Sequence, residues 1–207
     1  MPNFDSDLSQ EEILSKYLDS IYSRKGLDFK RVFNLNQQHQ GIDIIIDIKN
    51  IEYLIDEKAQ LHYLNKDLPT FTFELSFLKD NQLKIGWLLD KKKLTQYYFL
   101  ITGIYLKRGR VTLSEPEDIE KLKITSVNRD KLIKHLSFIN LHPSRLEQYD
   151  VEIRHNDCFG KNEIPELNPK SEGLIFYTNH LTEKPINLQL RLSYLIEKKL
   201  AKKFHYV

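Results

Sequence analysis

Cysteine is almost absent from this sequence, since Cys158 is the single thiol among 207 residues. One thiol cannot form a disulfide framework, so we expect a protein of a reducing compartment. A structural zinc site needs four suitable ligands, which one cysteine and scattered histidines do not supply. The nearby His155 does not turn Cys158 into a nucleophile pair either, because side chains this close in sequence seldom form a dyad.

Long hydrophobic runs and glycine signatures are missing as well. The longest apolar run, Tyr97–Leu106, is interrupted by Thr102 and Gly103 and is too short to span a bilayer. The first residues are polar and acidic, unlike a secretory signal, so we expect a soluble, cytoplasmic protein without a membrane partner. The sequence also has no Walker or Rossmann glycine pattern, no internal repeat and no heptads.

The charge has no strong bias toward either sign. The formal net charge is +2, with 31 Lys and Arg residues against 29 Asp and Glu residues. This balance neither requires nor excludes nucleic acid binding, because local patches matter more than the total. The length suits a single domain over residues 1–207. The polar segment 143–173, with three prolines, is the expected loop-rich insertion.

Residues 41–60 predict the β-hairpin on which the functional interpretation depends. Ile42–Asp47 and Ile51–Ala59 are rich in Ile, Leu and Tyr, as strands are. Lys49-Asn50 between them is a candidate two-residue turn. With that turn, the numbers of paired residues sum to 99. The predicted strand register follows from this rule.

This register sets Asp43 opposite Asp56, with Cβ atoms roughly 5 Å apart. Side chains alternate along a strand, so Lys58 and Gln60 share the face of Asp56. Two carboxylates this close repel unless one is protonated or a cation lies between them. Hard oxygen ligands suit Mg²⁺ or Mn²⁺, which predicts a metal site. The alternative is a hairpin whose charges are only solvated.

The spacing of these residues resembles the signature of the PD-(D/E)xK, or restriction-endonuclease-like, nuclease superfamily. Asp43 matches the first acidic residue and, after twelve residues, Asp56-Glu57-Lys58 matches the second acid and the lysine. Gln60 matches a glutamine that follows the lysine in some branches, while Ile42 stands where the motif has proline. The longer run from Gln38 through GID, DEKAQ and LPTFTFELSF is similar to an uncharacterised bacterial branch of that superfamily.

The resemblance implies an α/β fold with a mixed central β-sheet flanked by helices. It implies metal-dependent hydrolysis of phosphodiester bonds in nucleic acid, with DNA as the expected substrate, Mg²⁺ as cofactor and Mn²⁺ as its substitute. The implied metal ligands are Asp43, Asp56 and the backbone carbonyl of Glu57. Lys58 would orient water or stabilise the transition state, and Gln60 would position the water or a phosphate oxygen.

Two other functions remain open from the sequence. One is a catalytically inactive nuclease-like module that binds DNA or a protein. The other is a structural or regulatory protein of a mobile element. A homodimer is left open in each case.

Three further segments supply candidate supporting residues. A capping box at Ser9–Glu12 predicts the start of a first helix that stops near Gly26. The resemblance implies that Glu11, Glu12 or Asp19 on this helix could contribute to the metal site, and the alternative is that they only face solvent. The polar loop Asn34–Gln40 could contact substrate, with Gln38 singled out by the resemblance. Glu74, on the alternating strand Phe71–Phe77, would join the site if that strand neighbours the one that carries Asp56.

Candidate phosphate contacts come from two lysine clusters, with a plain solvated surface as the alternative. The first is Lys91, Lys92 and Lys93, and the second is the outer face of a final helix over Ser193–Phe204, with Lys198, Lys199, Lys202 and Lys203. The remaining expected elements are a helix over Asn128–Asn140 and strands over Phe29–Phe33, Leu83–Leu89, Thr95–Leu106, Ile124–Val127, Leu174–Thr178 and Ile186–Leu192.

Overall fold

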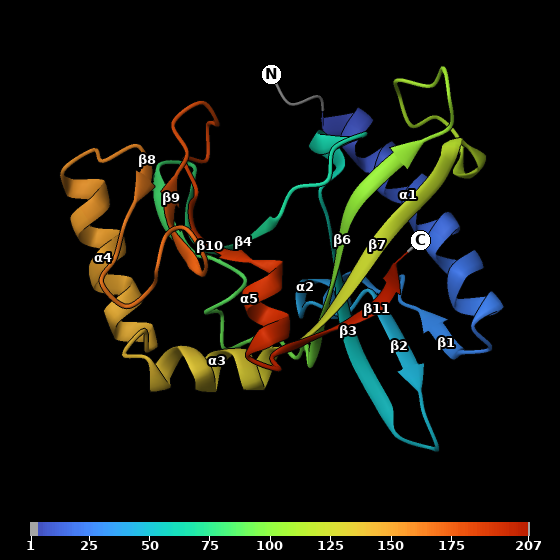
Figure 1. The fold of residues 1–207 in the computed structure, drawn as a ribbon, viewed down its shortest axis with the longest axis horizontal. Helices are drawn as coiled ribbons and strands as arrows, with labels where there is room; N and C mark the ends of the chain where they lie inside the picture. The colour runs from blue at the N-terminus through green and yellow to red at the C-terminus, as the bar shows by residue number, and fades with distance from the viewer. Residues whose placement is uncertain (1–3, 207) are drawn as a thin grey trace. The chain divides into compact units, whose positions relative to one another are not determined.

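The chain forms a mixed α/β structure with two β-sheets (Figure 1). The computed structural model describes residues 4–206, with the backbone alone for Phe4–Leu8. The predicted α/β class is confirmed, but the prediction of one central sheet is wrong. The strands between Pro69 and Leu94 belong to a separate sheet with strands from the last third of the chain, and they do not pair with the hairpin. The chain divides into two compact units, each discontinuous in sequence.

The first unit contains residues up to Leu68, Thr95–Val127 and the chain from Lys202 on. Its six-stranded sheet has the order β1-β2-β3-β6-β7-β11, in which β3 and β6 are parallel while β1–β2 and β2–β3 are antiparallel. The elements are α1 (Phe4–Arg24), β1 (Asp28–Arg31), α2 (Leu35–His39), β2 (Ile44–Asp47), β3 (Glu52–Ala59), the 3-10 turn η1 (Leu61–Tyr63), β6 (Tyr97–Leu106), η2 (Pro116–Asp118), β7 (Ile119–Asn128) and β11 (Ala201–Tyr206).

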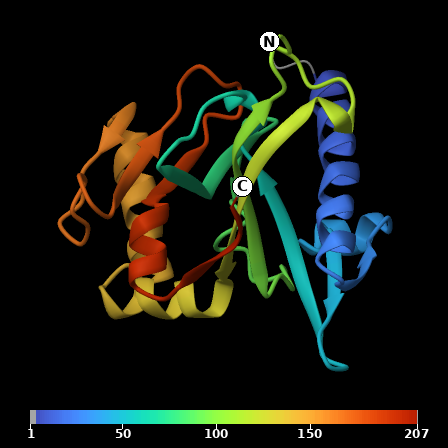
Figure 2. The same ribbon diagram turned by 45° about the vertical axis from the view of Figure 1, so that its right-hand side comes forward.

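Helix α1 covers one face of this sheet (Figure 2). Its apolar residues recur at helical spacing and pack on the inward side chains of β2, β3 and β6. The core they form includes Leu14, Leu18, Ile21, Tyr22, Ile44, Ile46, Ile55, Phe99 and Ile101. The predicted first helix is therefore confirmed. It begins at Phe4, five residues before Ser9, where the capping-box sequence had placed its start.

The hairpin between β2 and β3 has the predicted turn and register. Lys49 and Asn50 have φ of 57° and 62°, the left-handed values that a type I′ turn requires at both central positions. Ile48 and Ile51 exchange two backbone hydrogen bonds across this turn, at 3.0 and 3.2 Å. Ile44 pairs with Ile55, so the rule that paired numbers sum to 99 is confirmed.

The second unit contains Pro69–Leu94 and Asn128–Ala201. Its five-stranded sheet has the order β5-β4-β10-β9-β8, and each strand pair is antiparallel. The elements are β4 (Thr70–Lys79), β5 (Gln82–Ile85), α3 (Arg129–Phe138), α4 (Pro143–His155), β8 (Gly160–Asn162), β9 (Gly173–Tyr177), β10 (Ile186–Arg191) and α5 (Leu192–Glu197). None of the helices in the described part of the chain has the length and apolar character that a membrane crossing needs.

Two helix predictions in this unit had different outcomes. Asn128 caps α3 as predicted, because its Oδ1 accepts a hydrogen bond from the Lys131 amide at 2.8 Å. The loop-like prediction for 143–173 is wrong over its first part, which is α4. Pro143 occupies the first turn of that helix, where a proline loses no hydrogen bond and favours helix initiation.

The predicted final helix is also shorter than expected. Helix α5 ends at Glu197, and Lys199 has a left-handed φ of 59°, which stops the helix. The chain then forms β11, where Phe204 packs on Phe99 with ring centroids 4.6 Å apart. Tertiary packing has therefore overridden the helical pattern, and Lys202 and Lys203 lie on a strand.

Substitutions in the hairpin turn should separate backbone strain from side-chain loss. Asn50→Val should lower the free energy of unfolding by on the order of 1–2 kcal/mol, because a β-branched residue resists a left-handed φ. Asn50→Gly is the matched control, since it removes the side chain but permits the backbone, and its stability should equal or exceed the wild type. Urea unfolding checks both variants, and equal stability of the two would contradict the type I′ assignment.

Candidate active site

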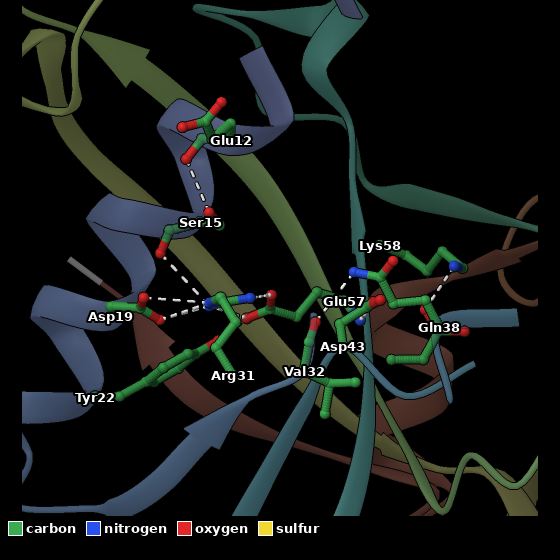
Figure 3. A network of polar contacts seen from close by, with 11 residues as sticks. Glu12, Ser15, Asp19, Tyr22, Arg31, Val32, Gln38, Asp43, Glu57 and Lys58 are labelled. Carbon is green, nitrogen blue, oxygen red and sulfur yellow. Dashed lines mark hydrogen bonds and ion pairs between the residues drawn. The ribbon is translucent and has the colours of Figure 1, made fainter. Parts of the chain in front are cut away.

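Asp43 and Lys58 lie on the same side of the hairpin (Figure 3), and Asp56 joins them through its ion pair with Lys58. Asp43 directly precedes the Ile44–Ile55 pair, and its amide donates to the carbonyl of Ile55, the residue before Asp56 on β3. The negative charge of Asp43 acts on both Asp56 and Lys58. Asp56 is only 1% exposed, and the Lys58 ammonium lies 2.5 Å from its Oδ1. The predicted cluster of two acids and a lysine is therefore present.

The backbone holds Asp43 at three points. Its Oδ2 accepts a hydrogen bond from the Glu57 amide at 2.8 Å. Its carbonyl accepts one from the Val32 amide, and its own amide donates to the Ile55 carbonyl, both at 2.9 Å. The carboxylate is thus fixed against β3 before any ligand arrives.

The surroundings favour the neutral form of Asp56. Burial raises the pKa of Asp56 to about 7, with Lys58 opposing the shift and the negative charge of Asp43 adding to it. Two acids at one site compete to ionise, so a proton or a cation is needed between them near neutral pH. Lys58 supplies one such positive charge, so a negative charge remains when both acids are ionised.

The charges of the same cluster keep Lys58 protonated. Burial alone would lower the pKa of the Lys58 ammonium, but Asp56 and Asp43, with a further contribution from Glu11, raise it above its ordinary value. Lys58 therefore acts as a positive charge and hydrogen-bond donor at neutral pH, not as a base. Among the three acids of α1 considered from the sequence, Glu11 is the one whose charge acts on this lysine.

A second polar network lies on the opposite side of β3, the side that faces α1 (Figure 3). Arg31 donates to Glu57 Oε2 at 2.6 Å and to Asp19 Oδ1 at 2.6 and 2.9 Å. Tyr22 donates its hydroxyl hydrogen to Glu57 Oε1 at 2.5 Å. Only 12% of the Arg31 side chain and 10% of the Glu57 side chain are exposed. This network joins α1, β1 and β3.

The pKa values within this network follow from burial and pairing. Burial raises the pKa of Glu57, and Arg31 and Tyr22 oppose that shift by stabilising the carboxylate. Burial and the neighbouring Glu57 charge together hold the Tyr22 pKa well above its ordinary value, so its hydroxyl remains a donor. The sequence analysis missed Arg31 and Tyr22 as neighbours of the site. The available signal was that Arg31 and Glu57 are charged at positions where alternation calls for apolar residues.

The donor atoms at the site fit Mg²⁺ better than a metal that needs a complete protein cage. Asp43 and Asp56 offer carboxylates, and the Glu57 carbonyl points to the same strand edge as its amide, which contacts Asp43. In the described residues, no group of three or more His, Cys, Asp or Glu side chains gathers as a metal site. Mg²⁺ commonly uses one or two carboxylates and keeps several waters, so such a group is not required.

Other predicted residues have partners that define their places. Glu12 forms an exposed ion pair with Lys16, while Asp19 binds Arg31. Gln38 donates to the Val32 carbonyl at 3.0 Å and lies on the same side of β3 as Asp43 and Lys58 (Figure 3). The predicted loop around it is wrong for residues 35–39, which form α2, because Asn34 caps the amides of Asn36 and Gln37.

Glu74 and Gln60 differ from the geometry that the sequence suggested. Glu74 was expected at the site only if its strand neighboured the strand of Asp56. This is not the case, because β4, which carries Glu74, pairs with β5 and β10 and not with β3. Strand β3 ends at Ala59, so the alternation used for Gln60 does not extend to it. Its amide still donates to the Ile101 carbonyl at 3.0 Å. The catalytic role of Gln60 stays a prediction.

The lysine clusters lie elsewhere in the chain. Lys91, Lys92 and Lys93 follow β5 in the second unit, and Lys198 and Lys199 follow α5 in the same unit. Lys202 belongs to β11 of the first unit. Since α5 ends at Glu197, the basic helix face that was to present Lys198, Lys199 and Lys202 does not exist. Their phosphate contacts stay predictions.

Asp43→Asn should stabilise the metal-free protein above neutral pH. The native state holds the Asp56 proton up to about pH 7, whereas the unfolded chain releases it near the ordinary aspartate pKa of 3.8, so wild-type stability falls as pH rises between these values. Removing the Asp43 charge lessens that fall. We compare the melting temperatures of Asp43→Asn and wild type in EDTA. The difference, variant minus wild type, should be larger at about pH 8 than at about pH 5. A difference independent of pH would contradict the carboxylate repulsion.

Comparisons with known proteins leave the family open. No protein-family model matches the chain, and no solved structure matches it. The chain is similar to the spore-specific protein YSW1 of Saccharomyces cerevisiae, with 23% identity over 128 residues, which is 61% of this chain and 19% of the yeast protein. The chain therefore spans about a fifth of the length of the curated relative that it matches.

Proposed function

We propose that the chain is a metal-dependent nuclease that hydrolyses phosphodiester bonds, with DNA as its expected substrate. The observation that supports this most is the buried Asp56 carboxylate, with the Lys58 ammonium 2.5 Å away and the Asp43 charge acting on both groups. The β-hairpin that holds the three groups, next to a parallel strand β6, agrees with a restriction-endonuclease-like first unit. Two acids and a lysine in this arrangement are the minimum set of the PD-(D/E)xK signature.

The charge balance around the hairpin favours a divalent cation. When all six groups are ionised, the four carboxylates of Asp19, Asp43, Asp56 and Glu57 face the two cations Arg31 and Lys58. Two negative charges remain in excess. A structure that is only a solvated hairpin has no need to bury Asp56 against another acid, because burial without a counterion is unfavourable.

Each residue has a chemical role that its geometry permits. Asp43, Asp56 and the Glu57 carbonyl would hold the metal, which polarises the scissile phosphate and acidifies a bound water. Lys58 remains protonated and can donate to a phosphate oxygen or orient the attacking water. The amide of Glu57 keeps the Asp43 carboxylate in place, so that little reorganisation is needed when substrate binds.

Divalent metal should bind at Asp43 and Asp56. Wild-type protein should therefore bind Mn²⁺ in isothermal titration and gain thermal stability in its presence, because a ligand of the native state stabilises it by mass action. Asp43→Asn should weaken Mn²⁺ binding by about tenfold or more. Above neutral pH, the Asp43→Asn variant should therefore be more stable than wild type in EDTA, but it should gain less thermal stability from Mn²⁺. Equal affinity of wild type and variant would place the metal elsewhere.

Lys58→Ala should abolish cleavage while metal and DNA binding remain. A contact used mainly in the transition state affects turnover more than affinity, and we expect a loss on the order of a hundredfold or more. The assay is nicking and linearisation of plasmid, with single-stranded and branched DNA in parallel, in Mg²⁺ and in Mn²⁺.

Lys134→Ala is the matched control for this experiment. Lys134 forms an exposed ion pair with Asp130, with 75% of its side chain accessible, so its loss should leave cleavage unchanged. Equal cutting by wild type and Lys58→Ala would reveal a contaminating nuclease or another site. Binding of DNA without any cutting by the wild type would favour the inactive binding module.

A further inference from the structure

Glu57 is a carboxylate in the middle of an otherwise apolar strand face. It lies between Asp56 and Lys58 in sequence, but its side chain points to the core side, where Ile55 and Ala59 flank it. An ion pair buried in a core seldom stabilises the fold more than apolar residues of similar size do. A structural role alone therefore does not explain why a charge occupies this position.

The Glu57 carboxylate is held by groups from two other elements. Arg31 of β1 binds Oε2 at 2.6 Å, and Tyr22 of α1 binds Oε1 at 2.5 Å. Arg31 is itself fixed by Asp19 of α1 through three hydrogen bonds. The Tyr22 ring cannot move freely, since it contacts the rings of Phe29 and Phe99. These contacts thus fix the orientation of the Glu57 carboxylate and stabilise its charged form.

The backbone around the same two residues reaches the candidate site. The Glu57 amide donates to Asp43 Oδ2 at 2.8 Å, so the orientation of this amide sets the orientation of the Asp43 carboxylate. Val32, which follows Arg31, donates its amide hydrogen to the Asp43 carbonyl at 2.9 Å. Arg31 and Val32 therefore constrain Asp43 in two ways. Arg31 binds the side chain of Glu57, whose amide binds the Asp43 carboxylate, and the Val32 amide binds the Asp43 carbonyl.

We infer that Arg31 and Glu57 are positioning residues, which orient the Asp43 carboxylate toward Asp56 from the opposite face of the sheet. The metal-binding consequence rests on the proposed function, whereas the positioning of Asp43 does not. Partners that orient ligands typically change metal affinity by about tenfold to a hundredfold when they are removed.

The test uses a double variant, Arg31→Met with Glu57→Leu. It removes one charge of each sign and fills the same space with apolar side chains. Exchanging a buried pair for apolar residues is often neutral for stability. Because this exchange also removes Arg31 from Asp19 and Glu57 from the Tyr22 hydroxyl, circular dichroism and the melting temperature check the fold first. The first readout is hydrogen exchange in EDTA of the amide at position 57, with the Gln60 amide as control. Gln60 directly follows the same strand and donates to Ile101 at 3.0 Å, outside the network.

We expect the amide at position 57 to exchange about tenfold or more faster in the double variant, while the Gln60 amide keeps its rate. The second readout is Mn²⁺ affinity by titration, which should fall by about tenfold or more. Unchanged exchange at position 57, or equal acceleration of both amides, would overturn the inference and leave a purely structural network. A third outcome is faster exchange at position 57 only, combined with no Mn²⁺ binding by the wild type. It would overturn the proposed function and leave the positioning of Asp43 intact.

Tyr22→Phe provides a second variant if the double variant does not fold. It removes the hydroxyl that binds Glu57 Oε1 and leaves every charge in place. The position-57 amide should exchange faster, and Mn²⁺ affinity should fall by a smaller factor than in the double variant. Identical exchange and affinity in Tyr22→Phe and wild type would overturn the positioning role of the network.

Discussion

The pairing register of β2 with β3 is the constraint on which the site depends. A shift by one residue would move every side chain of the hairpin to the other face, so Asp56 and Lys58 would enter the core and Glu57 would leave it. The turn at Lys49 and Asn50 fixes the register locally, and the burial of Ile44, Ile46 and Ile55 against α1 fixes it globally. Both constraints give the same answer, and the pairing ends at Ile44 and Ile55, directly beside Asp43 and Asp56.

Charge is distributed over both faces of β3 in a way that a purely structural hairpin does not require. On one face, Asp43 and Asp56 face a single ammonium, Lys58. On the other, Arg31 is shared between Asp19 and Glu57. Glu11 also acts on Lys58, so carboxylates outnumber cations on both faces. The raised pKa of Asp56 is the direct electrostatic result, because burial and the neighbouring acid act in the same direction.

The hairpin could be predicted because its signals are local. A two-residue turn between β-forming runs fixes pairing by counting, and alternation then assigns faces. The network around Arg31 could not be predicted in the same way, because its partners are separated by 12 and 26 residues and meet only when α1 packs on the sheet. A charged residue at an inward strand position was the available signal, but it did not identify the partner.

Longer-range arrangements overrode several local patterns. The helical spacing after Ser193 did not predict that Lys199 would turn left-handed and that Phe204 would pack on Phe99 in a strand. Pro143 was interpreted as part of a loop, although it starts α4. The separation of β4 from β3 into another sheet, which left Glu74 away from β3 in the strand order, depends on pairings with β10 that no local sequence feature specifies.

The central claim is that Asp43 and Asp56 together hold a divalent metal, and one measurement tests it most directly. Crystals of the wild-type protein soaked in Mn²⁺ would be measured at a wavelength where manganese scatters anomalously. The account predicts an anomalous peak between the two carboxylates, within about 2.0–2.3 Å of oxygens from both. A fully occupied Mn²⁺ at another position, or no anomalous peak between Asp43 and Asp56, would contradict it.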